Sequence, residues 1–147
     1  MTQEEKKLLL KDLCARLPYG VKCYNMFSEE ICELAAIELD SESPLFCFWD
    51  KRKMFYHQQT YISEFKPYLF PMSSMTEEQK RELRQMDAFI NTFGNVCFAV
   101  YDEYGHDIIP TYEDAIRITN WLNKNHYDYR GLIEKGLAID ATGLNIY

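Results

Sequence analysis

Three threonines, each followed three residues later by an acidic or amide side chain, constrain the fold of this chain more than any other feature. The pairs are Thr2 and Glu5, Thr76 and Gln79, and Thr111 and Asp114. Each pair can bond two of the backbone N–H groups that the first turn of a helix leaves without partners, so each marks a helix start. We therefore expect three helices, near 2–17, 76–91 and 111–124.

The residues between the first two helices favour short strands. Residues 20–26 and 54–57 have strand-like composition, and residues 45–49, LFCFW, are dense in large apolar side chains that suit a buried strand. Several short strands at close spacing predict a meander of antiparallel strands, curling into a small bent sheet or a barrel. Together with the helices, this pattern predicts an α+β fold.

Residues 31–39, ICELAAIEL, fit two structures. A strand would place every second residue on one face, namely Ile31, Glu33, Ala35, Ile37 and Leu39. Ser28 could instead begin a helix that contains Ile31, Leu34 and Ala35. A run this short cannot be assigned by periodicity alone. We favour the strand and keep the helix as the alternative.

The second half of the chain mixes strand, turn and linker signals. Residues 67–75, PYLFPMSSM, contain two prolines and are expected to form a linker, because proline lacks the N–H that regular pairing requires. Residues 96–101 favour a strand, and residues 126–147, punctuated by glycines, favour an irregular segment. The length of 147 residues matches the usual size of one domain, so we expect a single domain over 1–147.

The net charge of −7 disfavours nucleic acid as a partner. Nucleic-acid binding draws most of its affinity from Lys and Arg on phosphates. The one basic run, Lys51 to Lys53, is expected at a hairpin turn. Residues 29–42 hold six acids and no base, a pattern typical of a solvated face that could also meet a basic protein. We expect no nucleic-acid partner.

No apolar stretch approaches the roughly 20 residues that a membrane-spanning helix requires, and the N-terminus, MTQEEKKLLL, is charged and lacks a signal segment. We therefore expect a cytoplasmic protein without membrane association. The sequence indicates no particular oligomeric state.

Five scattered cysteines give an odd count, which does not describe a disulfide framework: Cys14, Cys23, Cys32, Cys47 and Cys97. No CxxC occurs and no cysteine has zinc-finger spacing to a histidine. We therefore expect reduced thiols, no bound metal and no cofactor.

Two sets of residues have the types that catalysis or cation binding needs. Cys47 with His57, His106 or His126 could supply a thiolate and a base, although no surrounding motif arranges them. Residues 102–107, DEYGHD, offer three carboxylates and a histidine, but without the alternating spacing of a calcium loop. A solvated turn is the expected structure there, and a non-enzymatic protein is favoured over an enzyme.

The segment HYDYRG at 126–131 is the candidate binding site. Its residues Tyr127, Asp128, Tyr129 and Arg130 follow a helix, and Tyr and Arg dominate the energetics of protein interfaces. The alternative is ordinary packing, with the tyrosines against the protein body and Arg130 paired with a nearby carboxylate.

Three segments resemble a set of small uncharacterised proteins encoded in prophages and mobile elements of Bacteroides-type gut bacteria: LCARLPYGVKC at 13–23, KPYLFPMSSMTEE at 66–78 and HYDYRGLIEKGLAI at 126–139. The resemblance covers about a quarter of the chain and leaves 84–118 outside it. It implies a bacterial cytosolic setting, a mobile-element origin and a strand at 31–39, and it implies no activity.

Three functions remain open on these grounds. The first is a non-enzymatic protein-interaction or accessory protein of a mobile element, favoured by the 15% aromatic content. The second is a small-ligand-binding domain with an aromatic pocket, and the third a Cys/His or metal-dependent enzyme. An exposed Tyr/Phe surface would favour the interaction protein, and a closed apolar cavity would favour the ligand-binding domain. A cysteine within hydrogen-bond reach of a histidine would favour the enzyme.

Overall fold

The computed structural model describes residues 1–38, 44–49, 55–58, 61–99, 101, 103–107 and 109–147. The contacts between Cα atoms divide the chain into two compact units. Unit 1 comprises 1–69 together with 130–147, and unit 2 comprises 70–129. The expectation of one domain over 1–147 stays a prediction, because compactness does not measure whether the units unfold together.

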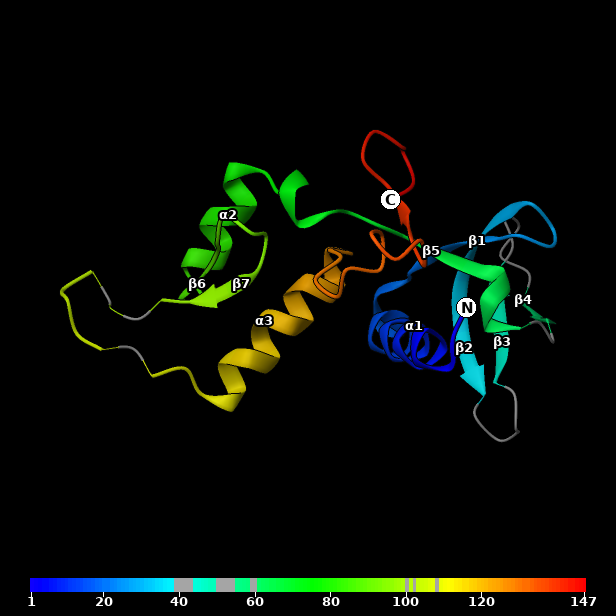
Figure 1. Cartoon of the computed structure of the whole chain (residues 1–147), viewed down its shortest axis with the longest axis horizontal. Coiled ribbons are helices and arrows are strands. Elements are labelled where there is room, and N and C mark those ends of the chain that lie inside the picture. The colour runs from blue at the N-terminus through cyan, green and yellow to red at the C-terminus, as the bar shows by residue number, and fades with distance from the viewer. Residues whose placement is uncertain (39–43, 50–54, 59–60, 100, 102, 108) are drawn as a thin grey trace. The chain divides into compact units, whose positions relative to one another are not determined.

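Within its described residues, unit 1 contains one long helix, two short 3-10 helices and six strands (Figure 1). In chain order they are α1 (Gln3–Arg16), η1 (Leu17–Tyr19), β1 (Lys22–Asn25), β2 (Glu30–Glu38), β3 (Leu45–Trp49), β4 (Phe55–Gln58), η2 (Ile62–Glu64), β5 (Phe65–Leu69) and β8 (Ile139–Asp140).

The described part of unit 2 contains two helices, one 3-10 helix and a two-stranded hairpin. They are η3 (Met72–Ser74), α2 (Glu77–Arg84), β6 (Ala88–Ile90), β7 (Val96–Phe98) and α3 (Tyr112–Lys124). Each of α1, α2 and α3 begins with the capping box that the sequence predicts. None of the helices within the described residues combines the length and the apolar character needed to cross a membrane.

The six strands of unit 1 form one sheet in the order β4-β3-β2-β1-β5-β8. Strands β1 to β4 pair antiparallel in sequence, which confirms the meander, and β8 pairs parallel with β5. Among the described strands the sheet is open, so it is not a barrel. The strand alternative is confirmed for 31–38, because β2 pairs with a neighbour on each side, and residue 39 lies outside the described residues. The fold is α+β.

The linker predicted for 67–75 is wrong at its start, because Pro67 lies inside β5 opposite Cys23 of β1. The backbone N–H of Met26 donates to the oxygen of Glu64 at 2.9 Å. Met26 and Glu64 therefore form a hydrogen-bonded pair, and along an antiparallel ladder such pairs alternate with pairs that are not hydrogen-bonded. Cys23 and Pro67 lie three positions further along the ladder, so they form a pair that is not hydrogen-bonded. The missing N–H of proline therefore costs no bond to β1.

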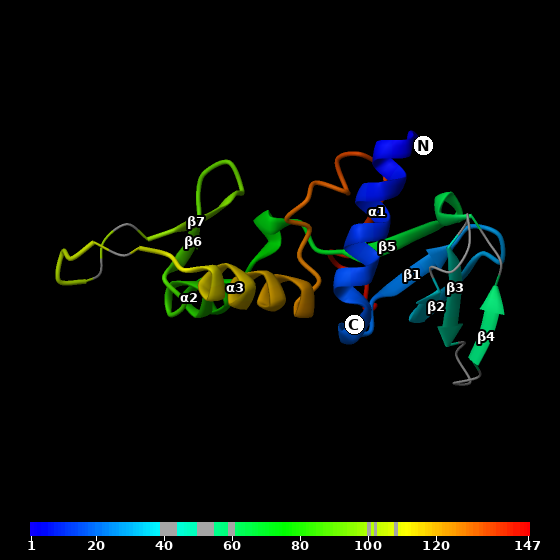
Figure 2. The ribbon, with the colours of Figure 1, turned by 90° about the horizontal axis from the view of Figure 1, so that it is seen from below.

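Helix α1 packs against the sheet of unit 1 and contributes to the same core (Figure 2). Leu9 and Leu13 are fully buried with aromatic side chains of β3 and β5. The rings of Phe48 and Phe65 lie 4.6 Å apart between centroids, within the range of favourable aromatic pairs. The core is thus built from large side chains, in keeping with the aromatic-rich sequence.

Residues 130–147 complete unit 1. Leu132 and Leu137 are buried in the same core as α1. The backbone N–H of Ala141 donates to the oxygen of Leu69 at 2.8 Å, and the hydroxyl of Tyr147 donates to the oxygen of Tyr68 at 2.8 Å. The irregular segment expected here therefore contains the edge strand β8, follows β5 and fixes the C-terminus to the sheet.

A buried carboxylate joins the two parts of unit 1. Asp12 and Arg16 are both fully buried in α1, and the Nε of Arg16 lies 2.8 Å from Asp12 Oδ2. The Nη1 of Arg130 lies 2.7 Å from Asp12 Oδ1. Burying a carboxylate is costly unless it is paired and hydrogen-bonded, and here two arginines pair with it.

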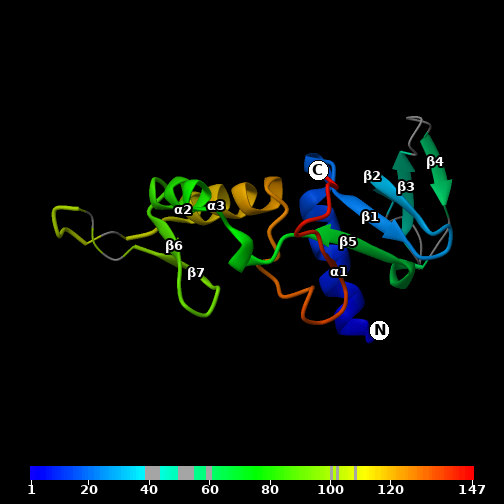
Figure 3. The ribbon, with the colours of Figure 1, turned by 90° about the horizontal axis from the view of Figure 1, so that it is seen from above.

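Unit 2 corrects the helix predicted for 76–91. The helix ends at Arg84, Asp87 takes a left-handed conformation (φ 56°), and β6 begins one residue later. The side-chain Oδ1 of Asn91 accepts from the backbone N–H groups of Phe93 and Asn95 at 3.0 and 2.9 Å. An Asn side chain that bonds its own turn favours a hairpin over a helix. The hairpin lies beside α2 and α3 (Figure 3).

The core of unit 2 is separate from that of unit 1. Its buried members are Met72, Met75, Leu83, Ala88, Ile118, Leu122 and Tyr127. The indole N–H of Trp121 in α3 donates to Glu82 Oε2 in α2 at 2.9 Å, so the two helices also contact each other at the surface.

We expect Asp12→Ala to lower the free energy of unfolding by about 3–5 kcal/mol, because it leaves two arginines in or near the core without their carboxylate. The control is Glu4→Ala on the same helix. Glu4 is exposed and lies 3.6 Å from Lys7, so its loss should cost less than about 1 kcal/mol. Urea unfolding of both variants measures the difference, and equal costs would contradict a structural role for Asp12.

Candidate functional site

Tyr127 of the predicted HYDYRG site packs inside unit 2. It is 3% exposed and its ring stacks on Trp121, with centroids 5.8 Å apart. Its hydroxyl donates to Gln79 Oε1 at 2.6 Å. Burial, together with the nearby charge of Glu82, raises the pKa of Tyr127 to about 12. This tyrosine is therefore a core residue with a bonded hydroxyl.

The other three residues of the site do not form one outward surface with it. Asp128 is buried, and the half-buried Tyr129 donates its hydroxyl to Asn123 Oδ1 at 3.0 Å within unit 2. Arg130 belongs to unit 1, where it pairs with Asp12. Because an interface needs accessible side chains, this geometry favours the packing alternative. A binding role for the four residues stays a prediction.

The backbone brings one predicted Cys and His pair together, because Cys47 of β3 lies opposite His57 of β4 in the strand register. The side chain of His57 lies outside the described residues. Burial, followed by the charge of Glu38, raises the pKa of the Cys47 thiol. A nucleophilic cysteine needs a lowered pKa, so the surroundings of Cys47 disfavour the thiolate.

The remaining cysteines and the acidic stretch 102–107 show no arranged site in the described part of the chain. Cys23 and Cys32 face each other across β1 and β2, and the Cys32 thiol donates to the backbone oxygen of Cys23 at 3.5 Å. The backbones of Tyr101 and Asp107 form an isolated antiparallel β-bridge. Gly105 between them takes a left-handed conformation (φ +83°), as a turn often requires. Within the described residues, no three His, Cys, Asp or Glu side chains gather as metal ligands. Asp102 and the basic run 51–53 lie outside those residues.

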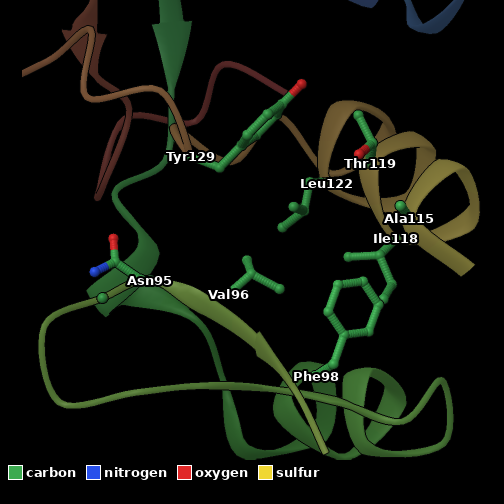
Figure 4. Close-up of a pocket in the computed structure, with 9 residues that line it drawn as sticks. Asn95, Val96, Phe98, Ala115, Ile118, Thr119, Leu122 and Tyr129 are labelled. Carbon is green, nitrogen blue, oxygen red and sulfur yellow. The ribbon is translucent and has the colours of Figure 1, made fainter. Parts of the chain in front are cut away.

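Unit 2 contains a pocket of about 310 Å³ between β7 and α3 (Figure 4). Val96 and Phe98 line it from the strand, and Ile118 and Leu122 line it from the helix. Ala115, Thr119, Gly94, Asn95 and Tyr129 complete the lining. The lining is mostly apolar, and the hydroxyl of Tyr129 is already bonded to Asn123. The pocket therefore suits an apolar group.

Residues 101–112, which we call the arm, lead from β7 to the first residue of α3 (Figure 1). Every described residue of the arm is exposed. Its large side chains are between 62% and 83% exposed: Tyr101, Tyr104, Ile109 and Tyr112. The chain contains no Lys or Arg between Arg84 and Arg117, while the same stretch holds six acidic residues.

The sequence patterns did not predict the arm or the pocket. The absence of basic residues from 85 to 116 was a readable signal for the arm, because an exposed segment usually mixes both charges. The pocket had no such signal, since it depends on how β7 packs on α3.

We expect Tyr127→Phe to destabilise the protein by about 0.5–1.5 kcal/mol at neutral pH, because it removes the hydroxyl that bonds Gln79. Tyr104→Phe, at an exposed position, should stay within about 0.5 kcal/mol of the wild type.

The raised pKa of Tyr127 means that this tyrosine ionises first in the unfolded chain, above about pH 10. The stability that the folded protein gains from the neutral Tyr127 hydroxyl is fully present below about pH 10, and it is lost as pH rises towards 12.

The advantage of the wild type over Tyr127→Phe should therefore shrink between pH 8 and about pH 11 in urea unfolding. An unchanged advantage, or an equal cost for Tyr104→Phe, would contradict the buried position of Tyr127.

Comparisons of this chain with protein-family models, with curated proteins and with solved structures found no match.

Proposed function

We propose that this chain is a non-enzymatic protein-interaction module, an accessory protein of a mobile element in the bacterial cytoplasm, and that the arm is its contact element. The observation that carries the proposal is the group of four large, strongly exposed side chains within the arm: Tyr101, Tyr104, Ile109 and Tyr112. Clustered exposed apolar side chains mark interaction sites on soluble proteins.

The arm contributes little to the core of unit 2. All its described residues are exposed, and the buried core of unit 2 contains none of them. Large apolar side chains that do not stabilise the fold need another reason to be present, and binding provides one. Tyrosine suits this role, because its ring gives contact area and its hydroxyl gives a hydrogen bond.

The charge of the arm indicates the partner. Three acidic residues lie in the arm, and the nearest Lys or Arg along the sequence are Arg84 and Arg117. Complementary charge speeds association, whereas like charges disfavour it. A second copy of this chain would bring another negative arm, so we propose a different protein with a basic surface and an apolar centre.

The pocket supports a second candidate, a small-ligand-binding domain, because most of its lining is apolar. The polar groups that would orient a ligand are few. Of the three polar side chains in the lining, the Tyr129 hydroxyl is already bonded to Asn123. The exposed arm therefore carries the preferred function.

The test is selection of binders from a displayed library of random peptides on the immobilised full chain. We expect enriched peptides to carry an excess of Lys and Arg together with a large apolar residue. The double variant Tyr104→Ser/Ile109→Ser should weaken their binding by tenfold or more, because truncation of an interface hot spot typically costs about 2 kcal/mol. Added salt should weaken it further.

The matched control is Phe27→Ser/Tyr61→Ser in unit 1, which alters two side chains of similar exposure, 77% and 69%. Its binding should equal that of the wild type. Enriched peptides without a positive charge, or equal binding by the arm variant, would contradict the proposal.

A further inference from the structure

We propose that the partner contributes an extended basic segment that adds to the hairpin as a third strand along β7 and inserts one large apolar side chain into the pocket. The inference rests on the proposed function, since it names how the same basic partner is held. It draws on different observations, namely the free edge of β7 and the position of the pocket.

Among the described strands, none pairs with the outer edge of β7. In the described part of the chain β7 pairs with β6 alone. The N–H of Asn91 donates to the oxygen of Asn95 at 2.9 Å, so these two residues form a hydrogen-bonded pair. Along an antiparallel ladder such pairs alternate with pairs that are not hydrogen-bonded, and Val96 and Phe98 both fall in pairs of the second kind. The N–H and C=O groups of Val96 and Phe98 therefore point away from β6. Such an edge is a template for an added strand.

The edge also lacks the residues that usually protect it. Exposed edge strands are commonly blunted by lysine or proline. Strand β7 reads VCF, and neither residue type lies between Arg84 and Pro110. An added strand would therefore meet neither a positive charge nor a missing donor on β7.

The pocket lies on the side of the hairpin where the strand would be added. Val96 and Phe98 of β7 line it, whereas no residue of β6 does (Figure 4). Side chains directly opposite each other in an antiparallel pair lie on the same face. A partner residue opposite Val96 or Phe98 would consequently face α3 and the pocket.

The size and charge of the site define the segment. At about 310 Å³ the pocket is at the lower end of the range for ligand sites, about 300–1,000 Å³, so it suits one large side chain. The acidic stretch between Arg84 and Arg117 favours basic residues beside that side chain. The segment would alternate basic and apolar residues, with its apolar side chains facing the pocket.

The probes are synthetic peptides of the repeating sequence Lys-Leu-Lys-Phe-Lys-Leu-Lys, measured by calorimetry against the full chain. One peptide carries N-methyl groups on the amides of its apolar residues, and a second carries the same number on lysines. In the antiparallel pairing only the N–H groups of the apolar residues point to β7. The first peptide should therefore bind at least about tenfold more weakly than the unmodified peptide, and the second should bind within about twofold of it.

Two variants test the pocket with full-length protein. Ala115→Leu fills it and should weaken binding of the unmodified peptide by tenfold or more, because a large side chain can no longer be buried there. Asn120→Leu adds the same side chain at an exposed position of α3 and should change the affinity less than twofold. Circular dichroism of both variants confirms that they are folded.

The outcomes separate this inference from the proposed function. Equal binding of the two N-methylated peptides, or no effect of Ala115→Leu, would overturn strand addition. If the arm variant Tyr104→Ser/Ile109→Ser still weakened that binding, the proposed function would stand. Loss of affinity with Ala115→Leu but equal binding of the two N-methylated peptides would mean that the pocket takes a side chain without strand pairing. No binding of any peptide would contradict both proposals.

Discussion

Asp12 is the group on which unit 1 depends. Its carboxylate lies in a fully buried position and contacts Arg16 one helical turn away and Arg130 on the returning segment. An unpaired carboxylate could not remain charged there, so the ion pairs hold the two ends of the chain together. Because residues 130–147 return to complete the core of unit 1, residues 70–129 must leave it and come back. Unit 2 is therefore an insertion after β5.

The two units carry different features. Unit 1 encloses its own core around α1 and the sheet, and its C-terminal residues follow β5. Unit 2 has a smaller core and carries the exposed arm, the open edge of β7 and the pocket. The proposed binding therefore rests on features of unit 2 alone.

Much of the fold could be predicted from local signals. The three capping boxes place the helix starts, and the alternation in 31–39 together with LFCFW gives the central strands. The end of α2 could not be read in this way, because it depends on the Asn91 turn and on the pairing of β6 with β7. The pair of Asp12 and Arg16 resembles an ordinary surface pair four residues apart, and only the contact with Arg130, 118 residues from Asp12, shows that it is buried. HYDYRG likewise suggested a surface because its tertiary contacts cannot be read from the sequence, whereas its tyrosines pack in unit 2.

The proposed contact between the arm of unit 2 and a basic protein can be tested by photo-cross-linking in the native host. One strain carries p-benzoylphenylalanine in place of Tyr104, and a second strain carries it in place of Phe27 of unit 1, which is equally exposed at 77%. We expect a discrete protein adduct from position 104 whose cross-linked peptide is rich in Lys and Arg, and none from position 27. Adducts from position 27 alone, or an acidic peptide joined to position 104, would contradict it.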